Sequence, residues 1–281
     1  MLSKIIKYKV EGKCDMTKVA IHDYFGYEIP MIERYELMYK VGFNAVMLGW
    51  AGFSDNPDET KHLNPELARK NGLHIENIHT PFLGANEFWL DNLDGDEYFK
   101  IQMQCINDCK KHEIPAMVLH INQGLIPPPI SEIGLERLKK LINKAENTNV
   151  YLAFENMRNI EHLRYIFTNM KSERVKFCYD SGHRNCKTPN EDLLVEFSDK
   201  LISIHLHDNN GLEDEHKLPF DGTINWNNIM RNIKKSNYAG ALCLEVVNSS
   251  YPNLTPLEFL QMAYKRTVNL LDLYEKNKIT K

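Results

Sequence analysis

The sequence has no apolar run close to the ~20 residues that a membrane-spanning helix requires. Its first residues, MLSKIIKYKVEGKCD, also lack the long apolar core of a secretion signal. The six cysteines are scattered without a C-x-x-C pair, and Cys105 and Cys109 have the spacing of one helix face. Reduced thiols without a targeting or membrane segment predict a cytoplasmic protein that has no membrane partner.

The sequence also has little excess charge. Its 34 Lys and Arg residues stand against 38 Asp and Glu residues, which gives a formal net charge of -4. Non-specific affinity for nucleic acid comes mostly from Lys and Arg that neutralise phosphates, so nucleic acid is an unexpected partner. A small anionic substrate is compatible with this composition, and so is an oligomer.

No linker or low-complexity segment divides the 281 residues. Short apolar runs of strand length alternate with longer helical patterns, which is typical of βα units around a parallel sheet. These runs cover residues 19–22, 45–49, 75–79, 116–120, 151–155, 176–180, 202–207 and 241–247. Eight units predict a (β/α)8 TIM barrel, with one catalytic domain at residues 17–281 after an N-terminal extension of residues 1–16. A doubly wound open sheet is the alternative, although it normally has fewer strands.

Most of the predicted strands end in a residue that can bind a metal or transfer a proton. The third to eighth runs end, in order, at His79, His120, Glu155, Asp180, His205 with His207, and Glu245. The C-terminal ends of barrel strands meet on one face, and that face carries the active site. We therefore expect these side chains to converge on one mouth.

A single histidine at a strand end would mean little, but six consecutive strands end in His, Asp or Glu. Carboxylates at the ends of apolar strands are rarely buried unless they are paired or bound to a metal. Imidazole together with carboxylate oxygen suits Zn, Mn, Co or Fe, and so many nitrogens argue against Mg or Ca alone. The pattern predicts a divalent metal site.

The stretch LISIHLHDNNGLEDEH at residues 201–216 is the densest in such ligands. His205 and His207 face the same side of a strand, so one can bind metal while the other orients a carboxylate or contacts substrate. Asp214 and His216 follow with the D-x-H spacing of a second ligand pair. A solvated charged loop is the equally plausible interpretation of this pair.

The motifs IHTPF, FEN, YDSGH, HLHDN, DEHKLPFDGTINW and LEV, spread over residues 75 to 250, are together similar to a known family. Their order and spacing resemble the xylose isomerase-like TIM-barrel superfamily. That superfamily includes sugar and sugar-phosphate isomerases and epimerases, together with apurinic-site nucleases of the endonuclease-four type.

The isomerase and epimerase branch implies one divalent metal and a reaction through an enediolate. Its metal ligands would be Glu155, Asp180, His205 and Glu245. The two glutamates would also move protons on opposite faces of the substrate, and His183 would contact the substrate. Ketose epimerases of this branch carry an Arg after the seventh strand, but no Arg lies between residues 184 and 231 here. Lys217 is the nearest cation.

The nuclease branch implies three zinc ions. Its nine ligands would be His79, His120, Glu155, Asp180, His183, His205, Asp214, His216 and Glu245. The negative net charge and the element HIN, which lacks the Pro-Gly expected after His120, favour the sugar branch instead. The number of ions, from one to three, stays open. A sugar lyase or dehydratase of the same superfamily, and a sugar-binding module with a structural metal, are further alternatives.

Residues after the second, third and seventh strands are candidates for the substrate pocket. Trp50 and Phe82 offer aromatic faces on which the C–H face of a sugar packs well, and Lys217 offers a charge. Arg158, just beyond FENM, fits either an exposed surface residue or a contact to a phosphate.

Overall fold

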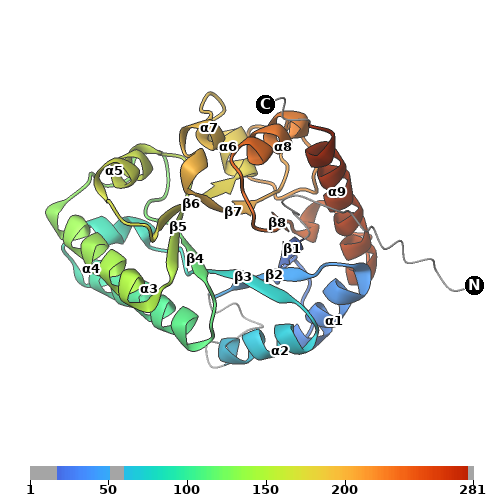
Figure 1. Ribbon diagram of the computed structural model, residues 1–281, viewed down its shortest axis with the longest axis horizontal. Coiled ribbons are helices and arrows are strands. Elements are labelled where there is room, and N and C mark those ends of the chain that lie inside the picture. The colour runs from blue at the N-terminus through green and yellow to red at the C-terminus, as the bar shows by residue number, and fades with distance from the viewer. Residues whose placement is uncertain (1–17, 51–59, 278–281) are drawn as a thin grey trace, which may run out of the picture.

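Eight parallel strands form a nearly closed barrel in the computed structural model, which describes residues 18–50 and 60–277. The strands follow the order β7-β6-β5-β4-β3-β2-β1-β8. Figure 1 shows them around the centre with the helices outside. The predicted single-domain (β/α)8 barrel is confirmed, and the predicted N-terminal extension of residues 1–16 lies outside the described residues.

The elements alternate along the chain as the sequence pattern predicted. The strands are β1 (Val19–His22), β2 (Ala45–Gly49), β3 (His74–His79), β4 (Ala116–Leu119), β5 (Tyr151–Glu155), β6 (Val175–Asp180), β7 (Leu201–His205) and β8 (Leu242–Leu244). The α-helices are α1 (Met31–Val41), α2 (Asn64–Lys70), α3 (Leu93–Lys111), α4 (Glu132–Thr148), α5 (Glu161–Asn169), α6 (Ser181–Lys187), α7 (Leu193–Glu196), α8 (Trp226–Lys235) and α9 (Pro256–Lys276). Single 3-10 turns are η1 (Lys61–Leu63), η2 (Ala85–Trp89), η3 (Ser198–Lys200) and η4 (Asn248–Ser250).

The barrel closes between β7 and β8 just beyond the regular strand ends. Leu206 and Leu244 form a parallel bridge, in which the Leu206 N–H donates to Cys243 O over 2.8 Å. The Glu245 N–H donates back to Leu206 O over 3.2 Å. This closure brings the end of β8 next to the end of β7, which is where the candidate ligands of both strands lie.

Strand alternation decides which residues reach the mouth of the barrel. Small buried side chains such as Ala20, Ala153, Cys178 and Cys243 lie inside the barrel, and Asn77 donates to Ser203 across it over 3.1 Å. The residue two positions further along each strand faces the same way and lies at the C-terminal end. Those residues are His22, His79, Glu155, Asp180, His205 and Glu245.

The helices cover the barrel through apolar faces, as α8 illustrates. Its buried residues Trp226, Ile229, Met230 and Ile233 recur with helical spacing. The helix begins where the Asn225 side chain accepts a hydrogen bond from the Asn228 N–H, so the amphipathic pattern and the N-cap agree.

Cysteine and membrane features also follow the sequence pattern. Cys105 and Cys109 lie together on the buried face of α3, and the cysteines in the described residues are free thiols. No helix in the described ranges is long and apolar enough to cross a membrane.

Candidate metal centre and active site

A cavity of about 140 Å³ opens at the C-terminal ends of the strands. Its lining comes from the ends of β1, β2, β3 and β8 and from the segment after β7, and includes His22, Gly49, His79, Phe82, His216 and Glu245. Barrel enzymes carry their active sites on this face. The cavity therefore offers the place for a small substrate.

Strands β5 to β8 each bring one metal-type ligand to this mouth. The ligand atoms of these four residues all lie within 4.8 Å of one another: Glu155, Asp180, His205 and Glu245. His205 Nδ1 lies 3.3 Å from Glu155 Oε2 and 3.0 Å from Glu245 Oε2. The four side chains predicted as metal ligands thus share one centre.

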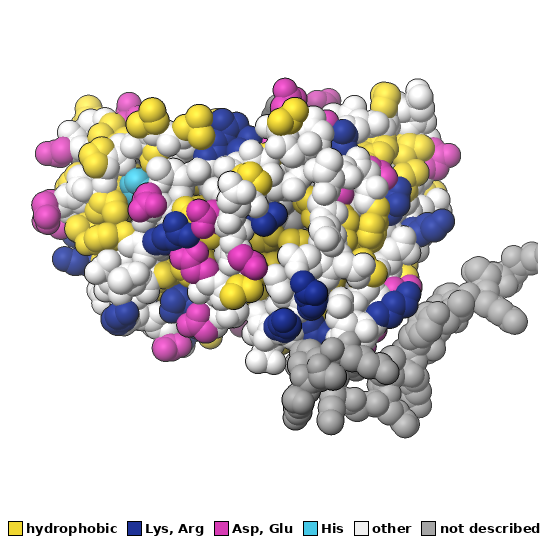
Figure 2. Space-filling view, turned by 90° about the horizontal axis from the view of Figure 1, so that it is seen from above, with side chains coloured by type: hydrophobic (Ala, Val, Ile, Leu, Met, Phe, Trp, Pro, Cys, Tyr) yellow, Lys and Arg dark blue, Asp and Glu magenta, His cyan; other side chains and the backbone are white. Residues whose placement is uncertain are grey.

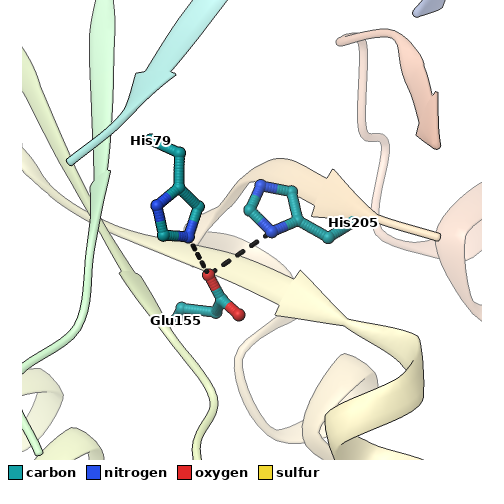
Figure 3. A group of neighbouring side chains, drawn as sticks. All are labelled: His79, Glu155 and His205. Atoms are coloured by element: carbon teal, nitrogen blue, oxygen red, sulfur yellow. Dashed lines mark ion pairs between the residues drawn. The ribbon is translucent and has the colours of Figure 1, made fainter. Parts of the chain in front are cut away.

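Four histidines surround the Glu155 carboxylate, which is 2% exposed. His79 Nε2 and His205 Nδ1 lie 3.4 Å and 3.3 Å from its Oε2 (Figure 3). His120 Nε2 lies 3.2 Å from the same oxygen, and His183 Nδ1 lies 2.9 Å from Oε1. A buried carboxylate surrounded by ring nitrogens is costly unless it is paired with a proton donor or bound to a cation.

A second cluster lies beside the first. The ligand atoms of His207, Asp214 and His216 lie within 4.8 Å of one another, and the two imidazole rings stack with centroids 4.0 Å apart. His183 Nε2 lies 2.9 Å from Asp214 Oδ2. His207 Nε2 lies 3.1 Å from both carboxylate oxygens of Asp180. Asp180 and His183 therefore connect the two clusters.

The segment between β7 and α8 is held toward the mouth by Asp208. The backbones of Asp208 and Lys217 exchange two hydrogen bonds of 2.8 Å and 2.9 Å. The buried Asp208 carboxylate also accepts from Trp226 Nε1 over 2.8 Å. Asp214 and His216 lie between these anchors, so they join the cluster and are not part of a solvated loop.

The YDSGH motif places Asp180 and His183 through close packing. Asp180 Oδ1 caps α6 by accepting from the His183 N–H over 2.6 Å, and the Asn156 side chain pairs with the Asp180 backbone over 2.8 Å and 2.9 Å. A Cβ added to Gly182 would overlap His207 Cε1. Glycine is required there because the His207 imidazole occupies that space.

Contacts with backbone carbonyls determine which ring nitrogen of His79 and of His216 faces the clusters. His79 Nδ1 lies 3.0 Å from Thr80 O, and His216 Nδ1 lies 2.8 Å from Glu245 O. A carbonyl only accepts hydrogen bonds, so Nδ1 carries the proton and Nε2 presents a lone pair. Metal-binding histidines typically donate their other N–H in this way. His216 also has a left-handed φ of 47°, a strained conformation of the kind found at functional sites.

Several buried polar atoms at this site have no hydrogen-bond partner within the described residues. They are both Glu155 oxygens, both ring nitrogens of His120 and of His205, and Asp214 Oδ1. Buried polar atoms are normally satisfied, so converging lone pairs without donors call for a bound group. Imidazole nitrogen with carboxylate oxygen suits Zn, Mn or Co. The residues present therefore fit a divalent cation.

The electrostatics of the site agree with that fit. Burial would raise the pKa of Glu155, but the neighbouring imidazoles of His120 and His205 hold that pKa well below its usual range. Burial would also raise the pKa of Glu245, but the His205 imidazole holds that pKa well below its usual range. Burial lowers the pKa of His183, but the carboxylates around it raise the pKa well above its usual value. Glu155 and Glu245 are therefore ionised, which is the form of a carboxylate that binds a cation.

The two aromatic residues predicted for the pocket lie in different environments. Phe82 lines the cavity, with its ring centroid 5.7 Å from that of His79. Trp50 is fully buried in the helical layer, where its Nε1 donates to Asp108 over 2.8 Å. The prediction that Trp50 lines the substrate pocket is wrong, because Gly49 faces the mouth and alternation turns the next side chain outward.

Lys217 lies in an ion pair outside the cavity lining. Its Nζ lies 2.6 Å from Glu215 Oε1, and its side chain is not part of the cavity lining. A contact between Lys217 and substrate stays a prediction.

A family model described as xylose isomerase-like TIM barrel matches residues 35–265. The chain belongs to this family. The predicted resemblance is therefore confirmed, and the strand-end residues of this xylose isomerase-like barrel occupy the face on which barrel enzymes work.

Two relatives with known sequences are similar over part of this xylose isomerase-like chain. An uncharacterized protein of Sinorhizobium fredii is 33% identical over 175 residues, which cover 57% of this chain and 55% of that protein. An uncharacterized protein of Methanocaldococcus jannaschii is 27% identical over 191 residues, which cover 61% of this chain and 64% of that protein. The chain thus spans only about half to two thirds of the length of these relatives.

Solved structures share the fold at low sequence identity. The IolI protein, crystallised with a bound zinc atom, has a TM-score of 0.77 and 18% identity, with 92% of this chain and 99% of that chain covered. A D-tagatose 3-epimerase-like protein has a TM-score of 0.73 and 19% identity, with 91% and 98% covered. At these identities the likeness establishes the fold alone.

One mouth residue of this xylose isomerase-like barrel was missed from the sequence, namely His22 at the end of β1. Its Nδ1 lies 3.0 Å from Tyr24 O, so Nε2 presents a lone pair. That Nε2 is buried without a hydrogen bond in the described part of the chain, and burial lowers the pKa of His22 to about 4. The signal was available, because the first apolar run, VAIH, also ends in histidine.

Proposed function

We propose that the protein is a divalent-metal-dependent isomerase or epimerase of a sugar or sugar phosphate that reacts through an enediolate. One observation carries this proposal. The ligand atoms of Glu155, Asp180, His205 and Glu245 lie within 4.8 Å of one another, and Glu245 also lines the cavity at the barrel mouth. A cation centre and a base thus meet at the place where a small substrate binds.

Proton abstraction beside a carbonyl is slow because the resulting carbanion is unstable. A bound divalent metal supplies Lewis-acid stabilisation of negative charge on substrate oxygens. Glu245 is ionised and its side chain is 15% exposed, so it can take a proton from a substrate carbon and return it. Phe82 lines the same cavity and offers an apolar wall against which the substrate would be shielded from water.

The arrangement of the two glutamates bears on the type of reaction. Glu245 alone suffices for a 1,2-isomerisation, in which one base moves one proton. An epimerisation needs a second group on the opposite face, for which Glu155 is the candidate. Glu155 lies deeper, with a side chain only 1% exposed. The names of the structural neighbours, which include D-tagatose 3-epimerase-like and zinc-bound proteins, support both the epimerase chemistry and a zinc ion.

The test is solvent deuterium incorporation into a panel of ketoses and ketose phosphates by metal-replete protein. We expect exchange at the carbon next to the carbonyl, together with an isomerised or epimerised product. Metal-bound protein that binds ketoses without exchange would instead be a sugar-binding module. Exchange with loss of water would identify a lyase or dehydratase.

A second candidate is a multi-metal phosphodiesterase of the endonuclease-four type. The second cluster favours it, since His207, Asp214 and His216 adjoin the first centre and have the residue types of a further metal site. Against this candidate, the chain has a net charge of -4, and Lys and Arg are interspersed with Asp and Glu on the side of the barrel seen in Figure 2.

We accordingly expect weak binding of double-stranded DNA at physiological salt and no efficient cleavage at an apurinic site. The reason is the net charge of -4, which disfavours contacts to phosphates. The measurement is cleavage of a labelled apurinic-site duplex by protein reconstituted with zinc, with an undamaged duplex as control. Rapid and specific cleavage at the apurinic site would make the nuclease the better-supported function.

His22→Phe should weaken substrate binding without loss of metal. His22 lines the cavity and its Nε2 has no hydrogen-bond partner within the described residues, so we expect Nε2 to accept a hydrogen bond from a substrate hydroxyl. Loss of one such bond costs about 0.5–1.5 kcal/mol, or roughly 2- to 10-fold in kcat/KM. His22→Gln, which keeps an acceptor, should recover part of the loss. An unchanged kcat/KM in His22→Phe would exclude this contact.

A further inference from the structure

We infer that a second cavity on the rim of the barrel binds a phosphate group of the substrate, so that the substrate is a phosphorylated sugar. This inference rests on the proposed function. The rim cavity has a volume of about 300 Å³ and is lined by residues 158–161 and 187–191. These residues belong to the loop after β5 with the start of α5, and to the end of α6 with the loop that follows.

The rim cavity lies beside the first ligand cluster. Arg158 is only three residues beyond Glu155, which is the last residue of β5. Lys187 is the last residue of α6 and follows His183 by four positions, which is one turn or about 6 Å along a helix. Both cations therefore leave the C-terminal face of the barrel next to candidate metal ligands. We infer that a substrate held at Glu155 and its neighbouring ligands extends toward this part of the rim.

Two positively charged side chains at the rim, those of Arg158 and Lys187, are available to bind an anion. Arg158 and Lys187 form no ion pair with the described part of the chain. The two acidic residues of the lining are already engaged by Arg164, whose guanidinium lies 2.7 Å from Glu191 and 3.9 Å from Glu161. Arginine and lysine together are a common way to bind phosphate, because the guanidinium matches its geometry and the ammonium adds charge.

Two further hydrogen-bond donors beside the rim cavity also suit a phosphate. Thr188 lines the cavity and is 9% exposed, yet its hydroxyl has no hydrogen-bond partner within the described residues. A buried hydroxyl without a partner is unusual and is satisfied by a bound acceptor. The N-terminus of α5 also borders the cavity. Its N-cap residue Ile160 provides no side-chain hydrogen bond, although Asn159 Oδ1 accepts from the Glu161 N–H over 3.0 Å. The N-terminal end of this helix favours an anion, although its first turn already carries the acidic side chain of Glu161.

The test is calorimetric binding of inorganic phosphate to the full-length protein and to an Arg158→Ala/Lys187→Ala double variant. We expect the wild type to bind phosphate and the double variant to bind roughly 10- to 100-fold more weakly, because charge-assisted hydrogen bonds are lost. Arg231→Ala/Lys140→Ala is the matched control, since it removes the same charge from exposed positions elsewhere and should bind phosphate as the wild type does. No binding by the wild type, or equal binding by both double variants, would overturn the inference.

A competition experiment identifies the source of the phosphate. D-tagatose 6-phosphate should displace phosphate from the wild type, and D-tagatose should not. If the ester fails to compete, the rim binds free phosphate and the substrate inference is wrong. Proton exchange into free ketoses by a protein that binds no phosphate would refute the rim site but leave the proposed function intact. Phosphate binding at the rim without exchange into any ketose would refute the proposed function, and with it the phosphorylated sugar as substrate, but not the rim phosphate site.

Discussion

Glu245→Gln should lower turnover by roughly 10²–10⁴-fold while the protein retains most of its metal affinity. Glutamine keeps the shape and one oxygen of the side chain but removes the basic charge, and general base catalysis typically contributes that factor. Glu155, Asp180 and His205 remain to bind the cation. The measurement is solvent deuterium incorporation into a ketose substrate, with metal content determined on the same sample.

The matched control is Glu136→Gln, which removes a carboxylate from an exposed position on α4. It should exchange protons at the wild-type rate. If Glu245→Gln also exchanges at that rate with its metal in place, Glu245 is only a ligand and the two-glutamate mechanism is wrong. A variant that has lost its metal would show instead that Glu245 contributes more to metal binding than its three partners can replace.

Removal of metal by a chelator should abolish activity and lower the melting temperature. Without a cation, the Glu155 oxygens and both His205 nitrogens lack hydrogen-bond partners within the described residues. A ligand at 100 times its Kd stabilises the native state by about 2.7 kcal/mol, so restoring Zn, Mn or Co should raise Tm by roughly 5–10 °C. The measurement is thermal unfolding of chelated and reconstituted protein, with activity assayed in parallel.

Two variants make this prediction specific. Glu155→Gln should lose part of the Tm increase, because Glu155 contributes an oxygen to the first cluster, whereas Glu136→Gln should keep it in full. Elemental analysis then counts the ions. One ion per chain would show that the first cluster alone binds metal. A higher ratio that decreases in Asp214→Asn would show that the second cluster binds metal as well. An unchanged Tm and full activity after complete removal of metal would contradict the metal-dependent mechanism.

The barrel could be predicted because its signals are local. Each strand is a short apolar run, and the chemically active residue stands at or next to its end, as in LAFE for β5 and FCYD for β6. Strand alternation then sets the direction of the side chain from the sequence alone. The same rule applied to Gly49 would have turned Trp50 away from the pocket, so that error came from ignoring alternation one residue past a strand end.

The role of the segment after β7 could not be predicted in the same way. Asp214 and His216 lie outside any strand, and a charged loop of this composition is normally solvated. Their position depends on contacts with distant residues, such as the hydrogen bond from Trp226 to Asp208 and the contact between His216 and the Glu245 carbonyl. Such contacts exist only once α8 and β8 have packed against the barrel.

The sequence by itself determined the order of strands and helices, the types of ligand at the strand ends and the family, because these depend on local periodicity and on motifs. The tertiary structure alone decided which ligands meet. Closure of the barrel at Leu206 and Leu244 brings β8 beside β7, and so places Glu245 3.0 Å from His205. It also decided that His207 packs over Gly182 and reaches Asp180. Distances between residues far apart in the chain follow from the register and closure of the whole sheet, which no short stretch of sequence encodes.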